Sequence, residues 1–243
     1  MNLLLVEPAE LRADGTCALA DRRAHHLRDV LRVRAGDEIR AGVLGGGVGR
    51  ARVISDDGET IVLAIAADQP ARPQLAVELV LAVPRPKVLS RVVETCAAFG
   101  VARVDLTNAW RVDKSYLESP RLAADALAHA ARLGAEQGAT THVPALAVHA
   151  RLMALLDARF AAPGGALRLI AHPDAPPIER AVTARGPVVL AIGPEGGWIA
   201  RELDTFVARG FVPVAIGTPI LRVEAAVAAA LGQLLLLQRI AAS

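Results

Sequence analysis

A proline-rich segment, Gln69-Pro70-Ala71-Arg72-Pro73, separates two parts of the chain whose apolar residues follow different patterns. Two prolines in five residues disfavour regular structure, because proline fixes φ and lacks the backbone N–H that helices and sheets use. Before this segment, short apolar stretches alternate with turn residues. After it, apolar stretches alternate with helical ones. We therefore predict a first domain at residues 1–68, a linker at 69–74 and a second domain at 75–243.

The first part is predicted to be rich in β-structure. Asp56-Asp57-Gly58 is a strong hairpin signal, because Asp-Gly tolerates positive φ, and Gly45-Gly46-Gly47 is a second candidate turn. One helical stretch, Asp21–Arg32, interrupts the pattern, with Asp21 as its expected N-cap. The strand candidates are Asn2–Val6, Glu38–Leu44, Ala51–Ile54 and Thr60–Ile65.

The second part is predicted to form a buried parallel sheet covered by helices, because continuous apolar runs alternate with helical stretches. The strand candidates are Leu75–Val83, Val101–Leu106, Leu167–Ala171, Val188–Ile192 and Val212–Ile216. The helix candidates are Val88–Phe99, Ala123–Glu136, His149–Phe160, Arg201–Arg209 and Glu224–Ile240.

Composition excludes several classes of protein. Cys17 and Cys96 are the only cysteines and have no companions at metal-ligand spacing, so we expect neither a disulfide framework nor a metal site. The apolar stretch Ala225–Leu237 is shorter than a bilayer requires, and the N-terminus lacks the features of a secretory signal, so we expect a cytoplasmic protein without a membrane span. A net charge of +2 is too small to indicate nucleic-acid binding by itself.

A glycine-rich segment, Gly193-Pro194-Glu195-Gly196-Gly197, follows one strand candidate and precedes a helical stretch. Its glycines therefore fall at the carboxyl edge of the predicted sheet, where open α/β folds bind ligands. The spacing fits neither a dinucleotide fingerprint nor a P-loop, so nicotinamide and nucleoside triphosphate binding are not supported. An ordinary strand-to-helix connection is the alternative interpretation.

A second glycine loop, residues 216–226, runs from the last strand candidate into the apolar C-terminal helix. Two loops that leave parallel strands at the same edge can face one pocket. Arg222 and Glu224 lie near the start of the helix, where a carboxylate is favoured by the positive helix end. The pair is either functional or a solvated pair at a helix start.

Together the two loops resemble the RsmE-type ribosomal RNA uridine N3-methyltransferases of the SPOUT superfamily. The C-terminal signature of that family is a Gly-Pro-Glu-Gly-Gly loop, a strand, and a Gly-x-x-Ile/Val-Leu-Arg-x-Glu-Thr/Ala segment, and both parts occur here in order and at matching separation, from Gly193 and from Gly217. The similarity covers nearly the whole chain, because it extends to Ala171-His172-Pro173, Pro84-Arg85-Pro86-Lys87 and His26-Leu27-Arg28-Asp29-Val30-Leu31-Arg32.

The resemblance implies an α/β fold in which a small PUA-like β-barrel domain precedes a SPOUT methyltransferase domain with a trefoil knot. It also implies that S-adenosylmethionine is the methyl donor, without a metal, and that the protein is a homodimer. The apolar residues Leu231, Leu234, Leu235 and Leu237 of the C-terminal helix are compatible with a dimer interface, although this helix could instead pack only into its own core. The residues implied in donor binding are His172, Gly193, Glu195, Gly196, Gly197, Ile216, Gly217, Leu221 and Val223.

The chemistry of methylation indicates what the catalytic residues must do. N3 of uracil has to lose its proton as or before it attacks the methyl group, and negative charge then develops near O2 and O4. Arg222 is the best candidate for stabilising that charge or for gripping a phosphate. Glu224 is a candidate for orienting Arg222 or accepting a proton, and Glu195 for shaping the donor loop.

RNA contacts are expected from both domains. Trp110, Tyr116 and Trp198 lie near the candidate site segments and could stack on a flipped base, with simple packing as the alternative. Arginine greatly outnumbers lysine, which suits phosphate recognition but also fits a bias in genome base composition. The candidate RNA-binding residues are Arg28, Arg32, Arg34, Arg85, Lys87, Arg111 and Lys114.

The chain departs from the usual family pattern in two segments that we expect to meet RNA. Residues 108–116 replace a Ser-Glu-Arg-like stretch, and Glu136-Gln137-Gly138-Ala139-Thr140 lacks the arginine of the usual Glu-Gln-x-x-Arg. The donor loops are intact. These features indicate a divergent member of the family.

The sequence thus predicts a methyltransferase that acts on N3 of a uridine in 16S ribosomal RNA, with ribosomal RNA or the small ribosomal subunit as its partner. One alternative keeps the fold and the donor but changes the RNA or the uridine. Another is a non-catalytic RNA-binding assembly factor. An unknotted Rossmann methyltransferase is disfavoured, because its first strand should lead into a glycine-rich loop and not into Pro84-Arg85-Pro86-Lys87.

Overall fold

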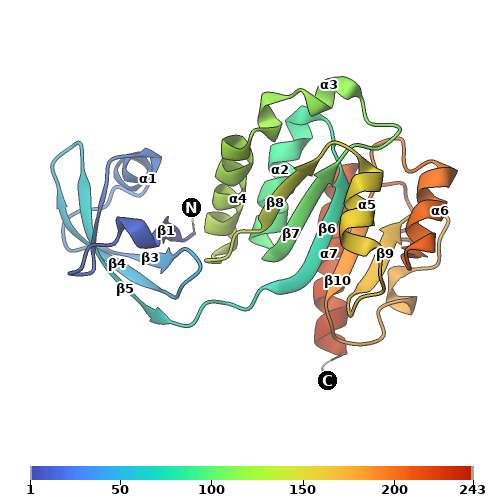
Figure 1. The fold of residues 1–243 in the computed structure, drawn as a ribbon. Coiled ribbons are helices and arrows are strands. Elements are labelled where there is room, and N and C mark those ends of the chain that lie inside the picture. The colour runs from blue at the N-terminus through green and yellow to red at the C-terminus, as the bar shows by residue number, and fades with distance from the viewer. Residues whose placement is uncertain (1, 242–243) are drawn as a thin grey trace.

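A computed structural model describes residues 2–241 as a small β-sheet unit joined by an extended segment to a larger α/β unit (Figure 1). The first sheet has the strand order β1-β3-β4-β5-β2, in which β1 pairs with β3 in parallel and the other pairs are antiparallel. Its strands are β1 (Leu4–Val6), β2 (Thr16–Leu19), β3 (Glu38–Val43), β4 (Val48–Asp56) and β5 (Ile61–Gln69).

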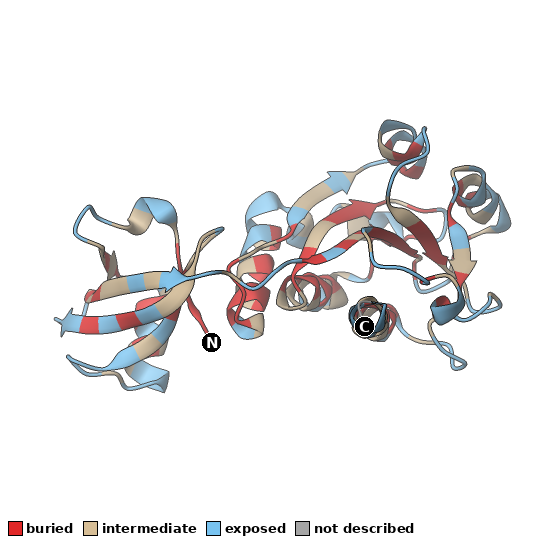
Figure 2. Cartoon of the chain, turned by 90° about the horizontal axis from the view of Figure 1, so that it is seen from below, coloured by how far each residue is buried: buried red, intermediate tan, exposed pale blue. Residues whose placement is uncertain are grey.

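Local signals in this unit act as the sequence predicts. The side chain of Asp21 accepts a hydrogen bond of 2.8 Å from the backbone N–H of Arg23 and so caps α1 (Arg22–His25), which continues into a π turn at His26–Val30. Gly58 has a φ of +92° in the turn between β4 and β5. Buried and exposed residues alternate along the strands (Figure 2), so one face of the sheet covers a small core.

The second sheet is parallel throughout, with the order β11-β9-β10-β6-β7-β8. The predicted α/β class is therefore correct. The strands are β6 (Leu75–Ala82), β7 (Val101–Thr107), β8 (Ala145–His149), β9 (Leu167–Ala171), β10 (Val188–Ile192) and β11 (Val212–Val214). The helices are α2 (Pro86–Ala98), α3 (Lys114–Leu117), α4 (Ala124–Gly138), α5 (Leu152–Phe160), α6 (Ala200–Ala208) and α7 (Val223–Ile240).

The strands that sequence patterns missed, β2 and β8, both lie at the edge of their sheets. An edge strand needs no continuous apolar run, and β8 has no fully buried residue. The helix expected from His149 begins instead at Leu152, because His149 is the last residue of β8. The trefoil knot stays a prediction.

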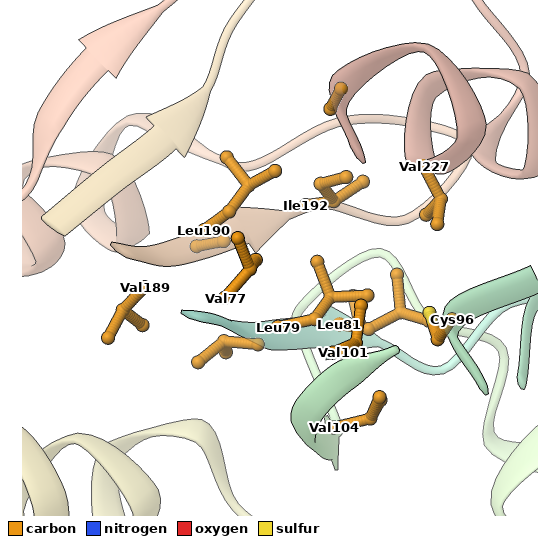
Figure 3. Packing of buried hydrophobic residues seen from close by; sticks show 14 of the residues in the cluster. Val77, Leu79, Leu81, Cys96, Val101, Val104, Val189, Leu190, Ile192 and Val227 are labelled. Carbon is orange, nitrogen blue, oxygen red and sulfur yellow. The ribbon is translucent and has the colours of Figure 1, made fainter. Parts of the chain in front are cut away.

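Successive side chains of β6 point to opposite faces of the second sheet, each of which is covered by helices. Val77, Leu79 and Leu81 point toward the face covered by α2 and α7, where they pack with buried residues such as Cys96 and Val227 (Figure 3). Glu78 points to the opposite face, toward α5, where its carboxylate pairs with Arg159. The free thiol of Cys96 is fully buried, and burial raises its pKa to about 12, as expected for a structural cysteine.

The first domain contacts the end of α4. The backbone N–H groups of Asn2 and Leu3 each donate a 3.1 Å hydrogen bond to the carbonyl of Glu136, and the guanidinium of Arg22 donates two, at 3.0 and 2.9 Å, to its carboxylate. The segment at Glu136 was expected to meet RNA. In the structure, Glu136 is 1% exposed and instead joins the two domains.

Candidate functional site

Three loops converge at the carboxyl edge of the second sheet. Strands β11, β9 and β10 are neighbours and run in parallel, so the segments that follow them leave the sheet on the same side. These segments enclose a cavity of about 480 Å³, which is within the size range of small-molecule sites. The cavity is lined by residues 171–174, 192–198, 216–217, 219–223, Arg111 and Ala226.

All residues predicted to bind the methyl donor line this cavity: His172, Gly193, Glu195, Gly196, Gly197, Ile216, Gly217, Leu221 and Val223. The residues are up to 51 positions apart in the chain, which is the difference between 172 and 223. Parallel strand order brings them together. The carboxyl edge of an open parallel sheet is also where α/β folds bind ligands.

Two glycines in the first loop meet specific backbone demands. Gly197 has a φ of +72°, and its N–H donates a 2.8 Å hydrogen bond to the carbonyl of Pro194, which closes a tight turn. At Gly193, a Cβ would lie 3.2 Å from the ring of Trp198, so the indole rests directly on the glycine backbone. A side chain at position 193 would therefore require the Trp198 ring to shift by a few tenths of an ångström.

Trp198 forms part of the cavity wall and carries an unpaired donor. Its side chain is 7% exposed and packs against Phe206, with ring centroids 5.0 Å apart. Its Nε1 is the only buried side-chain nitrogen or oxygen without a hydrogen-bond partner among the residues described. Buried donors normally have partners, so Trp198 keeps its position here although it lacks one hydrogen bond. Because its indole is buried, Trp198 does not present a ring face for the base stacking that the sequence suggested.

Residues from two neighbouring loops hold the glycine loop in place. The side chain of Glu195 accepts a 3.1 Å hydrogen bond from the backbone N–H of Arg85, and their side chains are 3.8 Å apart. The guanidinium of Arg111 donates a hydrogen bond to the carbonyl of Gly196. Glu195 therefore shapes the loop, as the sequence indicated. Arg85 and Arg111 were expected to contact RNA; in the structure they contact this loop.

The two predicted catalytic residues differ in their positions. Arg222 is the N-cap residue of α7, is exposed and lines the cavity. Glu224 is half-buried in the first turn and does not line it. No hydrogen bond or ion pair joins these two side chains in the described part of the chain. Arg222 is thus placed to contact a molecule bound in the cavity, whereas Glu224 is not.

The predicted RNA-binding residues are exposed or half-exposed and are divided between the two domains. In the first domain, Arg28 is held by Asp56 through hydrogen bonds of 3.1 and 2.7 Å, so its charge is already paired. Arg32 and Arg34 are exposed near the start of β3. Lys87, at the start of α2, and Lys114, at the start of α3, are exposed in the second domain.

A row of arginines on the first sheet escaped sequence analysis. Arg40 of β3 lies directly opposite Arg50 of β4, and Arg52 faces the same side two residues further along. Glu38 lies opposite Arg52 in the strand register, and its carboxylate is 3.3 Å from the guanidinium of Arg50. Glu38 offsets only part of the charge of these three exposed arginines, so this face of the sheet is positively charged and suits anions. The i, i+2 spacing of Arg50 and Arg52 was the only signal in the sequence.

The C-terminal helix divides its apolar residues between two surfaces. Leu231 and Leu234 are fully buried in the core of their own domain. Leu235, Leu236 and Ile240 are 39%, 47% and 60% exposed and form an uncovered apolar strip. By length and composition α7 could cross a membrane, which is weak evidence because core helices of soluble proteins pass the same test; a third of its residues are buried inside the protein.

Both domains match known families. Residues 71–235 match the RNA methyltransferase domain, and residues 19–66 match the RNA methyltransferase PUA domain. The two domains and the glycine-lined cavity thus define an RNA methyltransferase with a PUA-like first domain. The chain belongs to this RNA methyltransferase family, and its predicted resemblance to the RsmE-type members is confirmed.

Individual relatives are similar over most of their length. The chain is 26% identical to the ribosomal RNA small subunit methyltransferase E of Synechocystis, over 95% of this chain and 76% of that relative. It is 28% identical to the protein of the same name from Treponema pallidum, over 95% and 89%. The crystal structure of the Neisseria gonorrhoeae ribosomal RNA small subunit methyltransferase E bound to S-adenosyl methionine has a TM-score of 0.79 at 24% identity and 98% coverage of both chains.

Proposed function

We propose that this protein transfers a methyl group from S-adenosylmethionine to N3 of a uridine in the 16S RNA of the small ribosomal subunit. The convergence of the loops after β9, β10 and β11 on one cavity carries the proposal. The names of the relatives from Synechocystis and Treponema pallidum support the ribosomal RNA of the small subunit as the substrate. The RsmE-type signature at Gly193 and Gly217 supports the uridine N3 position.

The cavity fits S-adenosylmethionine through its own donors and its shape. The indole of Trp198 adds a buried apolar surface to the cavity wall. The first turn of α7 has no side-chain cap and begins at Val223 on the cavity wall, so its free N–H groups suit a carboxylate. Gly197 has no atom within 4 Å of the position that a Cβ would take, so its backbone stays accessible to a ligand.

S-adenosylmethionine supplies a methyl group bound to a positively charged sulfur. The protein must align the uracil with that group and stabilise the negative charge that develops on the base. Arg222 lines the cavity and is exposed, so we assign this stabilisation to its guanidinium. Glu224 lies outside the cavity lining, which favours a role in positioning the start of α7 over direct proton transfer.

For the RNA, we propose a path across both domains. The row Arg40, Arg50 and Arg52 on the first sheet is suited to phosphates, which carry most of the affinity in RNA binding. Arg85, Lys87, Arg111 and Lys114 are exposed cations of the second domain, and Arg111 lines the cavity. Arg28 is paired with Asp56 and contributes less.

We further propose a cytoplasmic homodimer whose interface includes the exposed strip of Leu235, Leu236 and Ile240. Exposed apolar residues that adjoin one another on a helix commonly mark an interface. We also retain the trefoil knot for the segment that includes the loops after β9, β10 and β11. Light scattering at several protein concentrations tests the dimer, and a monomer at all concentrations refutes it.

Methyl transfer to small subunits from cells that lack the gene tests the function. Purified protein, labelled S-adenosylmethionine and these subunits are incubated, and the nucleosides of the RNA are identified by mass spectrometry. N3-methyluridine is the expected product. A different methylated nucleoside, or transfer only to another RNA, refutes the uridine assignment. Donor binding without transfer to any RNA would instead indicate a non-catalytic assembly factor.

A further inference from the structure

We propose that Trp110 is a stacking platform for an RNA base at the mouth of the donor cavity. The inference rests on the proposed function, because it assigns the RNA contact of the same site. Trp110 lies in the segment 108–111 that follows β7, where the chain departs from the usual family pattern. Its side chain is 78% exposed, which makes it the most exposed aromatic residue among those described.

The backbone around Trp110 is held firmly although its ring is free. The N–H of Trp110 donates a 2.8 Å hydrogen bond to Glu202, a residue of α6 that is 7% exposed. The other carboxylate oxygen of Glu202 accepts a 3.1 Å hydrogen bond from the N–H of Ile199, just beyond the glycine loop. The buried carboxylate of Glu202 thus fixes the backbone at Trp110, while the indole itself stays exposed to solvent.

The next residue connects this support to the cavity. Arg111 lines the cavity, and its guanidinium binds the carbonyl of Gly196 in the glycine loop. Its side chain is also close enough that a Cβ on Gly196 would lie 3.0 Å from its Cδ. Trp110 is therefore attached to the rim of the donor site by the residue that follows it in the chain.

The charges near Trp110 favour RNA over a protein partner. Arg111 and Lys114 are exposed in the same segment. The carboxylate between them, Asp113, accepts hydrogen bonds from the N–H and hydroxyl of Ser115, so it caps α3. An exposed aromatic ring in the same segment as cationic side chains is the composition of single-stranded RNA sites, where bases stack on the ring and phosphates meet the cations.

The two tryptophans of the chain have different roles in this scheme. Trp198 is buried in the cavity wall, whereas Trp110 is exposed and does not itself line the cavity, although its neighbour Arg111 does. An exposed tryptophan has no packing role to explain it, because it removes little apolar surface from water. Base stacking would bury the ring only when RNA is bound. This arrangement places a base beside the donor cavity without a sequence-specific hydrogen bond.

Steady-state methyl transfer to small subunits and direct RNA binding together test the proposal. Trp110→Ala should lower kcat/KM for the subunits by at least about fivefold, as expected for the loss of one base–aromatic stack, and should leave the Kd for S-adenosylmethionine unchanged. Trp110→Phe should stay within about twofold of the wild type, because a phenyl ring still stacks. Val207→Ala removes another exposed apolar side chain, 46% exposed on α6, and serves as the matched control.

Tryptophan fluorescence separates this inference from the proposed function. Decauridylate should quench the emission of the wild-type protein and should quench Trp110→Phe much less, whether or not methyl transfer occurs. Wild-type kinetics in Trp110→Ala, together with no quenching, overturns the proposal while leaving the methyltransferase intact. Shielding of Trp110 from acrylamide in the RNA-free protein also overturns it, because the ring would then lie in a contact between protein chains. Quenching without any methylation would sustain the stacking role and reject the proposed function.

Discussion

Replacement of Asp105 by asparagine should destabilise the second domain more than any exposed charge change. Asp105 of β7 is fully buried, and its carboxylate accepts hydrogen bonds from Arg103 at 2.9–3.1 Å, from His149 at 2.8 Å and from Arg159. Glu78 on β6 also pairs with Arg159. Without the charge of Asp105, the carboxylate of Glu78 alone would balance the guanidinium groups of Arg103 and Arg159.

The magnitude follows from the burial of these groups. Removal of one partner from a buried ion pair costs about 3–5 kcal/mol. The side chains of Arg103 and Arg159 remain 32% and 23% exposed, so water compensates them partly, and we expect a loss of about 3 kcal/mol. The matched control is Asp157→Asn, because Asp157 is 66% exposed and pairs only with Arg209, so its loss should cost about 0–1 kcal/mol.

The effect should depend on pH. Burial alone would raise the pKa of Asp105, but hydrogen bonds from Arg103 and His149, with the charge of Arg159, lower it below the usual range. A carboxyl group with a lowered pKa in the folded state stabilises the protein above its unfolded pKa of about 3.9, and that contribution is lost as the pH falls through the folded pKa. The stability difference between wild type and Asp105→Asn should therefore be constant near neutral pH and shrink below about pH 4.

Urea unfolding followed by tryptophan fluorescence is the appropriate measurement. Both tryptophans, Trp110 and Trp198, lie in the second domain, so their emission reports the unfolding of that domain without a signal from the first. A free energy of unfolding for Asp105→Asn within about 1 kcal/mol of that for Asp157→Asn would refute the reasoning. That result would mean that solvent, and not the carboxylate of Asp105, stabilises the charges of Arg103 and Arg159.

Further expected outcomes concern the donor loop, the helix packing and the RNA surface. Gly193→Ala should weaken S-adenosylmethionine binding at least about tenfold in calorimetry, because its Cβ would lie 3.2 Å from the Trp198 ring and displace it; an unchanged Kd would contradict this. Gly134→Ala should lower the melting temperature, with a loss of about 2–3 kcal/mol, because its Cβ would lie 2.1 Å from the carbonyl oxygen of Glu94 in α2; a raised melting temperature would show that helix propensity outweighs this clash. Arg52→Ala should weaken RNA binding and reduce its salt slope by about 1, while donor binding is unchanged; an unaltered slope would exclude a phosphate contact at this residue.

Local sequence patterns determined the elements that lie in the centre of the second sheet. Strands β9 and β10 have the predicted ends, because buried parallel strands are continuous apolar runs bounded by turn residues. The N-cap at Asp21 and the turn at Gly58 were also predictable, since they depend on nearest neighbours in the chain. The glycine loops could be placed at the carboxyl edge of the sheet for the same reason.

Sequence patterns could not determine which side chains meet across the fold. Arg40 lies opposite Arg50 because of the register between β3 and β4. Glu136 is buried because the first domain packs against α4. Trp110 and Trp198 are the same residue type near the same site, yet one is exposed and the other lies in the cavity wall.

The sequence by itself thus determined the α/β class, the order of most elements and the family, because periodicity and short motifs are properties of the chain alone. The tertiary structure decided which residues line the cavity, which charges are already paired and which surfaces stay uncovered. Those features arise from contacts between residues far apart in sequence, and burial and electrostatics depend on such contacts.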